Sequence, residues 1–313
     1  MRPSVIPPPP TRATQGKPLR QRYGLPLVAL AALTIACSPR RGIEGWVLDD
    51  RVVRSADIAY GEGPRQRLDV YRDRMARGPE PVIVFLYGGR WKHGSKRDYV
   101  LLGNALARRG WIVVVPDSRL YPEALFPAWV EDAARAVRWS RANVARFGGD
   151  STRIVVVGHS SGAHTVAMLA LDERYLRRAG LPAGAVTGFV SLAGPVDTTW
   201  TAPDVQRLMG PRDGWPATYP YNFVDGTDPP LLLLHGASDD VVTVGNSVRL
   251  AEKITSRGGC VRLGVYKGVG HIEIVLALAF PSLGLAPAMR DVGEFVRDPV
   301  AYACADRAAA VVR

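Results

Sequence analysis

Residues 153–164 read Arg-Ile-Val-Val-Val-Gly-His-Ser-Ser-Gly-Ala-His, and this stretch decides the fold. Its run of branched apolar residues predicts a buried strand, because a strand covered on both faces is apolar at every position. The run ends in Gly158-His-Ser-Ser-Gly162, which fits the pattern Gly-x-Ser-x-Gly, and a helical segment follows at once. In that context a tight turn lifts a serine hydroxyl clear of the backbone. We therefore interpret Ser160 as a nucleophile at the end of a strand; an ordinary Gly/Ser turn is the alternative.

Strands and helices alternate on both sides of this stretch. The predicted strands are 58–60, 67–71, 81–87, 111–115, 153–157, 185–192, 231–235 and 261–266. The predicted helices are 96–109, 127–147, one that begins directly after Ser160, 243–256 and 287–296. This alternation predicts an α/β fold, with a mostly parallel central sheet and helices on both faces. In such sheets, ligands bind beyond the carboxyl ends of the strands.

The overall charge does not indicate a nucleic-acid partner. The chain has 313 residues, of which 47% are hydrophobic and 22% charged, which is typical of a globular protein. Its net charge is +11, but residues 1–43 hold seven Lys and Arg and no acidic residue. The remainder carries 33 basic and 29 acidic residues, interspersed as on an ordinary solvated surface. We therefore expect no nucleic-acid binding.

The N-terminal region has the features of an export signal. Residues 1–24 are basic and rich in proline, and residues 25–36 carry no charge. This apolar run is shorter than the roughly 20 residues that span a membrane, but it suits the core of a secretory signal. Leu33-Thr-Ile-Ala-Cys37 resembles the lipobox of bacterial lipoproteins, with Thr34 at the usual leucine position. We expect export to a bacterial cell envelope, with a periplasmic chain anchored to the membrane by a lipid on Cys37. An uncleaved anchor, or cleavage at another site, is the alternative.

These features divide the chain into four parts. We expect a leader at 1–37, a linker at 38–54, a catalytic domain at 55–300 and a tail at 301–313. Residues 195–228 hold five Pro and show no clear period, which predicts an irregular insert within the domain. In an oxidising compartment Cys260 and Cys304 could form a disulfide that pins the tail. Two buried free thiols are an equally consistent interpretation.

A serine nucleophile needs a base and an acid partner for that base. The histidines are His93, His159, His164, His235 and His271. We assign the base to His271, because it follows the last strand and can reach over the sheet edge; a surface-loop histidine is the alternative. His159 and His164 lie too near the turn at Ser160, and His235 is interpreted as structural. Asp239 is our candidate for the carboxylate that orients His271, with Asp240 as the alternative.

A tetrahedral intermediate needs backbone N–H donors for its oxyanion. Ser161 follows the nucleophile and supplies one donor in this geometry. The loop Tyr87-Gly-Gly-Arg-Trp91 follows the strand at 81–87, and Gly88 and Gly89 would let its backbone approach the substrate closely. A simple strand-to-loop turn is the alternative. Nothing in the sequence has the ligand spacing of a metal site, so we expect no metal and no cofactor.

Seven strings together resemble α/β-hydrolase esterases of the hormone-sensitive-lipase-like and feruloyl-esterase-like (BD-FAE) group, which includes isoprenylcysteine methylesterases and arylformamidases. They are Tyr87-Gly-Gly-Arg-Trp91, Pro116-Asp-Ser-Arg-Leu-Tyr-Pro-Glu123, Phe126-Pro-Ala128, Phe147-Gly-Gly-Asp150, Gly158-His-Ser-Ser-Gly-Ala-His164, His235-Gly-Ala-Ser-Asp239 and Gly270-His271. The resemblance implies an α/β-hydrolase fold with a small cap. It also implies a serine hydrolase that cleaves small carboxylic esters through an acyl-enzyme. Many relatives begin the first string with His, where this chain has Tyr87.

Three other functions are compatible with the same residues. An amide or formamide hydrolase and an acyltransferase would use the same three side chains, and a catalytically silent envelope binding protein would use none of them. The pocket candidates are aromatic residues, most of them in the insert: Trp91, Tyr121, Trp200, Trp215, Tyr219, Tyr221 and Phe223. Packing within the insert's own core is the alternative for these side chains.

Overall fold

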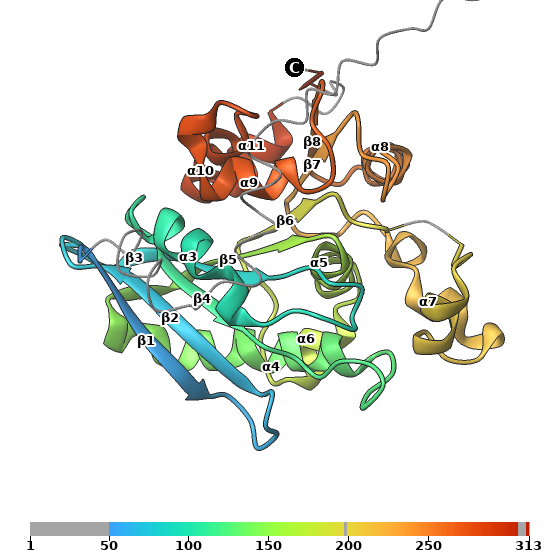
Figure 1. Cartoon of the computed structure of the whole chain (residues 1–313). Helices are drawn as coiled ribbons and strands as arrows, with labels where there is room; N and C mark the ends of the chain where they lie inside the picture. The colour runs from blue at the N-terminus through green and yellow to red at the C-terminus, as the bar shows by residue number, and fades with distance from the viewer. Residues whose placement is uncertain (1–49, 197–198, 306–310, 313) are drawn as a thin grey trace, which may run out of the picture. The chain divides into compact units, whose positions relative to one another are not determined.

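The computed structural model describes residues 50–196, 199–305 and 311–312 (Figure 1). They belong to one compact unit, Val47–Arg313. The predicted leader, Cys37 and residues 38–49 of the predicted linker lie outside the described residues. Among the described residues, no helix has the length and apolar character needed to cross a membrane.

The core is a nine-stranded sheet with the order β1-β2-β4-β3-β5-β6-β7-β8-β9. Its strands are β1 (Val52–Ala59), β2 (Arg67–Asp73), β3 (Glu80–Leu86), β4 (Ile112–Pro116), β5 (Gly149–His159), β6 (Gly188–Leu192), β7 (Leu231–Gly236), β8 (Val261–Tyr266) and β9 (Val311–Val312). The β1–β2 and β2–β4 pairs are antiparallel, and all others are parallel. The mostly parallel sheet predicted from the sequence is confirmed.

The central strands are apolar because both of their faces are covered. Every residue of β4, β6 and β7 is buried, whereas β1, which pairs only with β2, alternates between exposed and half-buried positions. A continuous apolar run is therefore the sequence signature of a strand in the middle of this sheet. Because the central strands run parallel, the carboxyl ends of β3, β5, β7 and β8 meet at one edge of the sheet.

Helices form a layer on each face (Figure 1). One layer holds α3 (Val100–Ala107), α9 (Glu273–Ala279), α10 (Ala288–Arg297) and α11 (Pro299–Cys304); the other holds α4 (Ala128–Asn143), α5 (Ser161–Leu171), α6 (Arg174–Arg178) and α8 (Gly245–Ser256). Each layer encloses a separate hydrophobic core against the sheet. Phe295 is fully buried in the first core, and Trp129 is almost fully buried in the second.

The structure corrects several predicted elements. The segment 96–109 is a short 3-10 turn, η1 (Lys96–Tyr99), followed by α3, and the segment 127–147 is α4 followed by η2 (Val144–Phe147). The insert is not irregular throughout, because it contains α7 (Pro203–Leu208), η3 (Arg212–Thr218) and η4 (Pro220–Phe223). Elements this short complete one or two turns, so their apolar residues show no detectable period. The short helices α6, α9 and α11 and the 3-10 turn η5 (Pro281–Leu283) were not predicted.

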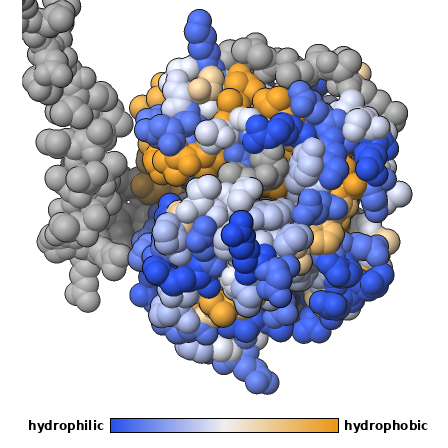
Figure 2. Space-filling view, turned by 90° about the vertical axis from the view of Figure 1, so that its right-hand side faces the viewer, coloured by the Kyte–Doolittle hydropathy of each residue, from blue (hydrophilic) through white to orange (hydrophobic). Residues whose placement is uncertain are grey.

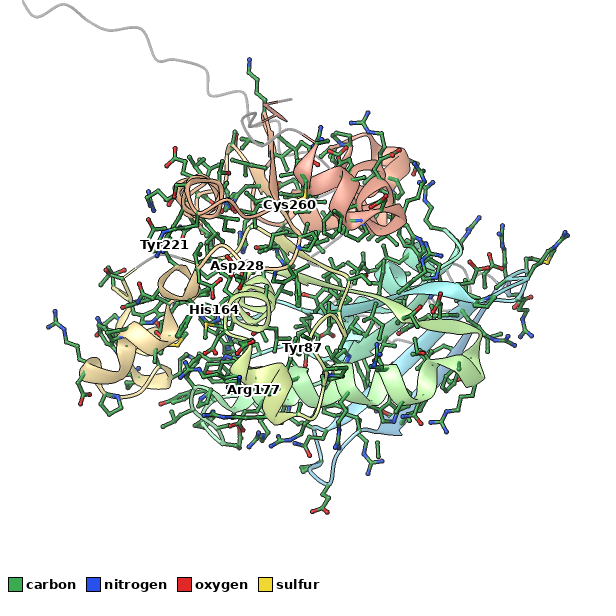
Figure 3. The ribbon with its side chains drawn as sticks, turned by 180° about the vertical axis from the view of Figure 1, so that it is seen from behind. Tyr87, His164, Arg177, Tyr221, Asp228 and Cys260 are labelled. Carbon is green, nitrogen blue, oxygen red and sulfur yellow. A yellow bond between two sulfur atoms is a disulfide. The ribbon has the colours of Figure 1, made fainter. Side chains whose placement is uncertain are left out.

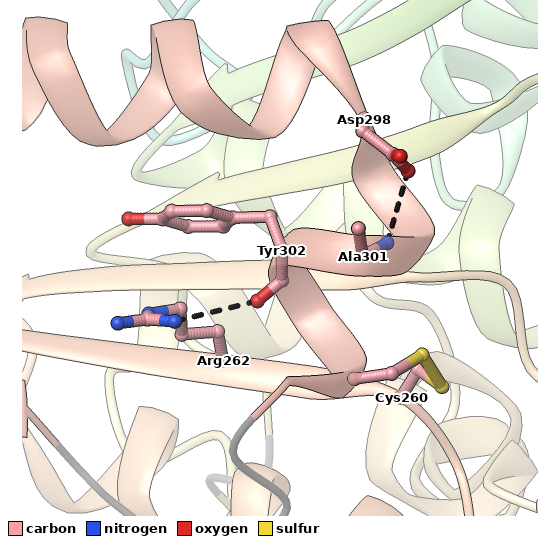
Figure 4. Close-up of a disulfide and its surroundings, with 6 residues drawn as sticks. Cys260, Arg262, Asp298, Ala301 and Tyr302 are labelled. Atoms are coloured by element: carbon pink, nitrogen blue, oxygen red, sulfur yellow. Dashed lines mark hydrogen bonds between the residues drawn. A yellow bond between two sulfur atoms is a disulfide. The ribbon is translucent and has the colours of Figure 1, made fainter.

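A disulfide joins Cys260 to Cys304, 44 residues apart (Figure 4). It links the residue before β8 to the end of α11. Of the two interpretations of these cysteines, a disulfide and two buried free thiols, the structure shows the disulfide. Beside it, the Arg262 guanidinium lies over the Tyr302 ring, 4.4 Å from its centroid. The Asp298 carboxylate accepts a 2.9 Å hydrogen bond from the Ala301 N–H and caps α11. The helix α11 is thereby attached to the strand that leads to His271.

Candidate active site

The turn between β5 and α5 presents Ser160 in a strained conformation. Ser160 has φ 55° and ψ −120°, a region that residues with a side chain seldom occupy. Its N–H donates a 2.9 Å hydrogen bond to the Leu192 carbonyl of β6, which helps to hold this conformation. A Cβ on Gly162 would lie 2.1 Å from the Leu86 carbonyl oxygen, and one on Gly158 would lie 2.5 Å from the Gly162 carbonyl oxygen. The pattern Gly-x-Ser-x-Gly is therefore a steric requirement of this turn.

The structure brings Ser160, Asp239 and His271 together. The Ser160 Oγ lies 2.9 Å from His271 Nε2, and His271 Nδ1 lies 2.7 Å from Asp239 Oδ2. Ser160 follows β5, Asp239 follows β7 and His271 follows β8, so the three residues meet at the shared carboxyl edge of the sheet. Asp239 and His271 are buried, whereas Ser160 is half-buried. The alternative carboxylate, Asp240, is exposed.

The Asp239 carboxylate is held in place at both oxygens. Its Oδ1 accepts hydrogen bonds from the N–H groups of Val241 (2.9 Å) and Val242 (2.8 Å). Its Oδ2 also lies 3.3 Å from His235 Nε2. Burial raises the pKa of Asp239, but hydrogen bonds from His235, Val242 and His271 outweigh burial and hold this pKa well below its usual range. The side chain is therefore a carboxylate at neutral pH.

Two buried histidines near the turn support the site without facing the hydroxyl. His159 Nε2 lies 2.8 Å from the His271 carbonyl oxygen, and His164 Nε2 lies 2.8 Å from the Thr218 carbonyl oxygen. Burial lowers the pKa of each to about 4, with the proximity of His271 adding to the effect at His159. Both rings are therefore neutral at pH 7, and each donates its Nε2 proton to a carbonyl. His93 is exposed.

The loop after β3 packs directly on the serine turn. A Cβ on Gly88 would lie 2.9 Å from the Ser160 Cβ, and one on Gly89 would lie 2.2 Å from the His93 carbonyl oxygen. Gly89 also has φ +137°, which favours glycine. Burial raises the pKa of Tyr99, whose ring stacks on that of Tyr87 at the start of this loop with centroids 5.4 Å apart, to about 12. Gly88 therefore lies beside Ser160, and Gly89 lies in the tight turn of the same loop.

A cleft of about 190 Å³ opens beside Ser160. The loop after β3 contributes Arg90 and Trp91, the insert contributes Trp200 and Val205, and the loop after β7 contributes Val242. Figure 2 looks onto the side of the molecule that carries α7 and α8, where hydrophobic areas lie among hydrophilic ones. The lining is mostly apolar, which suits a ligand with a compact apolar group.

The predicted pocket aromatics divide between the cleft and the hydrophobic core beneath it. Trp91 and Trp200 line the cleft, and their rings cross edge to face with centroids 5.8 Å apart. Of the other candidates, Trp215 is buried, and Tyr121, Tyr219, Tyr221 and Phe223 pack against the same core. The pocket interpretation therefore holds for Trp91 and Trp200, whereas the others join the main core on this face of the sheet and not a separate core of the insert.

The insert is attached to the helix that follows Ser160. The Trp200 Nε1 donates a 2.6 Å hydrogen bond to Thr218 Oγ1, and the carbonyl of the same threonine accepts from His164 on α5. His164 belongs to α5 and is fully buried in the interior of the molecule (Figure 3). These bonds fix the wall of the cleft relative to the nucleophile.

An ion pair between the loop after β3 and the insert was not predicted. The Arg90 guanidinium lies 2.9 Å and 3.1 Å from the two carboxylate oxygens of Asp204 in α7, and Lys92 Nζ lies 3.3 Å from one of them. Residues 90 and 204 are far apart in sequence, and no sequence pattern predicts that two such distant charged residues form an ion pair. Within the described residues, no group of three or more His, Cys, Asp or Glu side chains could hold a metal ion.

The sheet order and the serine turn define an α/β-hydrolase. The solved structures that the chain resembles include a truncated carbohydrate esterase from gut microbiota (TM-score 0.68, 23% identity, 81% of this chain and 98% of that one). Another is an esterase from Pyrobaculum calidifontis (TM-score 0.65, 23% identity, 89% of this chain and 99% of that one). These likenesses establish the fold that the sequence predicted.

The chain belongs to the BD-FAE family, whose family model matches residues 68–254, more than half of the sequence. It is 34% identical over 272 residues to esterase LipC of Mycobacterium tuberculosis, covering 75% of this chain and 66% of the relative. It is 29% identical over 259 residues to isoprenylcysteine alpha-carbonyl methylesterase ICME of Arabidopsis thaliana, covering 70% of this chain and 56% of the relative. The chain thus matches between about half and two thirds of the length of these two relatives.

Proposed function

We propose that this chain hydrolyses carboxylic esters of small molecules through an acyl-enzyme on Ser160. The observation that carries the proposal is the continuous series of polar contacts from Ser160 Oγ through the His271 ring to the Asp239 carboxylate, at 2.9 Å and 2.7 Å. The names of the relatives, an esterase and a methylesterase, support the same reaction class.

The geometry supports a reaction in two halves. His271 Nε2 accepts the Ser160 proton as Oγ attacks the ester carbonyl carbon, and the carbonyl π electrons move onto oxygen. When the carbonyl re-forms, the bond to the alcohol oxygen breaks and His271 returns the proton to that oxygen. Water then attacks the acyl-enzyme by the same route, which releases the acid and restores Ser160.

The negative charge that develops on the carbonyl oxygen needs donors that are already in position. We propose the backbone N–H groups of Gly88, Gly89 and Ser161, which belong to the two turns that meet at Ser160. Asp239 stabilises the imidazolium of His271, and its low pKa keeps it charged while it does so.

A serine-directed fluorophosphonate probe tests the nucleophile directly. We expect the probe to label the purified chain, and Ser160→Ala to abolish the labelling. Ser161→Ala is the matched control, because it removes the neighbouring hydroxyl and keeps the backbone donor, so its labelling should persist. Equal labelling of Ser160→Ala and the unmodified chain would remove Ser160 from the mechanism.

We further propose that the chain is an exported lipoprotein, anchored to the envelope membrane through Cys37. Cys37 lies outside the described residues, so the proposal rests on its sequence context and on the Cys260–Cys304 disulfide, a bond typical of oxidising compartments. Cys37→Ser should move the protein from the membrane fraction to the soluble fraction of bacterial cells. An unchanged membrane fraction would argue against lipidation.

A further inference from the structure

Tyr87 begins the loop after β3, at the position where this chain departs from the family pattern. Its side chain is buried, and Figure 3 shows it in the interior of the molecule. The hydroxyl donates a 2.7 Å hydrogen bond to Asp117 Oδ1 and accepts a 3.0 Å hydrogen bond from Arg65 Nη2. The directions are fixed, because a guanidinium can only donate and a carboxylate can only accept. Burial, followed by the charge of Asp117, holds the pKa of Tyr87 well above its usual range, so the phenol keeps its proton.

The same two partners also hold the far end of the loop. Arg65 Nη2 donates to the Gly94 carbonyl at 2.8 Å, and Asp117 Oδ1 accepts from the Lys96 N–H at 2.7 Å. The ring of Tyr87 packs closely there too, because a Cβ on Gly94 would lie 2.9 Å from its Cε2. The two ends of segment 87–96 therefore converge on one cluster of polar groups, in which Asp117 is buried and Arg65 is half-buried.

The backbone between these ends is strained. Gly89, Arg90 and Trp91 have φ values of +137°, +56° and +58°, and two of the three carry side chains. Consecutive residues in this region persist only where the surrounding structure imposes the conformation. Within the loop, the Lys92 and His93 N–H groups both donate to the Gly89 carbonyl, at 3.1 Å and 3.0 Å. This fixes the peptide group on one side of Gly89, whose N–H is a proposed oxyanion donor.

We propose that the Tyr87 hydroxyl is a positioning group, which acts through Asp117 and Arg65 to hold this loop with the Gly89 N–H directed at the oxyanion. This inference rests on the proposed function and assigns Tyr87 no contact with the substrate. Without the hydroxyl, the strained loop loses one of its anchors and the donor moves out of place. The negative charge on the oxyanion develops only in the transition state, so displacement of the Gly89 N–H lowers kcat. Arg90 and Trp91 are the cleft residues that belong to this loop, whereas the other named parts of the cleft come from the insert and the loop after β7, so KM changes less than kcat.

Tyr87→Phe tests this with the loss of one oxygen atom, and Tyr266→Phe is the matched control. Tyr266 is also buried, and its hydroxyl donates to Asp291 Oδ2 at 2.7 Å on the side of the sheet covered by α10. In the full chain with p-nitrophenyl acetate, we expect Tyr87→Phe to lower kcat about tenfold or more with KM within about twofold. Tyr266→Phe should keep kcat within about twofold. Equal losses in the two variants, or no loss in Tyr87→Phe, would overturn the proposal.

A double-mutant cycle asks whether Tyr87 acts through Asp117. In an Asp117→Asn background, Tyr87→Phe should lower kcat by less than about threefold, because the partner through which the hydroxyl acts is already altered. A Tyr87→Phe effect as large in this background as in the unmodified chain would contradict the proposed route.

Amide hydrogen exchange provides a readout that does not depend on ester turnover. In the full chain, amides of residues 88–94 should exchange about tenfold faster or more in Tyr87→Phe, and at the unmodified rate in Tyr266→Phe. Unchanged exchange in Tyr87→Phe would overturn the positioning role, even with esterase activity established by Ser160→Ala. If Tyr87→Phe exchanges faster but the unmodified chain hydrolyses no ester, the result would support the anchoring of the loop by Tyr87 and contradict the proposed ester hydrolysis.

Discussion

The Nδ1 atom of His271 lies 2.7 Å from Oδ2 of Asp239, and the carboxylate is already fixed through its other oxygen by two backbone N–H groups. The carboxylate therefore determines the orientation of the ring before any substrate arrives. This leaves Nε2 facing the Ser160 hydroxyl as a base, which is the tautomer that acyl transfer requires.

Asp239→Asn should lower kcat about 10³- to 10⁴-fold, because the amide group presents its own N–H to Nδ1 or loses the bond, and the ring no longer favours the reactive tautomer. Asp240→Asn is the control on the neighbouring exposed carboxylate, with kcat expected to stay within about threefold. Steady-state kinetics on p-nitrophenyl acetate measures both variants. A comparable loss in Asp240→Asn would contradict the assignment of Asp239.

Gly162→Ala should destabilise the chain by at least about 3 kcal/mol, because its Cβ would lie 2.1 Å from the Leu86 carbonyl oxygen and neither backbone can move freely. Gly78→Ala is a suitable control, since a Cβ there meets nothing within 4 Å, and it should change the free energy of unfolding by less than about 0.5 kcal/mol. Urea unfolding followed by circular dichroism measures both. Similar stability of the two variants would show that the turn is looser than the structure indicates.

Loss of the Cys260–Cys304 disulfide should lower the free energy of unfolding by about 4 kcal/mol, from the chain entropy of a loop closed across 44 residues. Cys304→Ser and treatment of the unmodified chain with reductant should give the same decrease in Tm. Reductant should have no effect on Tm in Cys304→Ser. A Tm that is insensitive to reductant in the unmodified chain would show that the bond is absent from the purified protein.

His164 should make the chain less stable as the pH falls below neutrality. Its pKa is lowered to about 4 in the folded chain, while the unfolded value is near 6.5, so the unfolded state binds more protons between these pH values. The free energy of unfolding should therefore fall by about 2 kcal/mol from pH 7 to pH 5 on account of this residue. His164→Gln should remove that part of the pH dependence, whereas substitution of the exposed His93 by Gln should leave it unchanged. Identical pH profiles for His164→Gln and the unmodified chain would refute this assignment.

The fold and the three proposed catalytic side chains could be predicted because they follow from strand ends. Short apolar runs predict β5, β7 and β8, and in a parallel sheet their carboxyl ends meet at one edge. The short motifs that follow these strands then single out Ser160, Asp239 and His271. The sequence favours Asp239 over the adjacent Asp240 through the string His235-Gly-Ala-Ser-Asp239, and the structure gives the physical reason, because backbone contacts bury Asp239 and leave Asp240 exposed.

Contacts between distant loops could not be predicted from sequence patterns. Arg90 and Asp204 pair across the cleft, and Tyr87 meets Arg65 and Asp117, each from a separate connection between strands. The helix α9, directly after His271, is uniformly apolar over most of its length, so it lacks the alternation of polar and apolar residues that reveals a surface helix. These features depend on tertiary packing, which the local spacing of residues does not encode.

The most direct test of the account is turnover of p-nitrophenyl esters of increasing acyl length by the purified chain, compared with Ser160→Ala. We predict hydrolysis by the unmodified chain, with a chain-length limit set by the cleft, and a loss of at least about 10⁴-fold in Ser160→Ala, with its circular dichroism spectrum unchanged. Equal turnover by the folded Ser160→Ala variant, or none by a folded unmodified chain, would contradict the assignment of ester hydrolysis to Ser160.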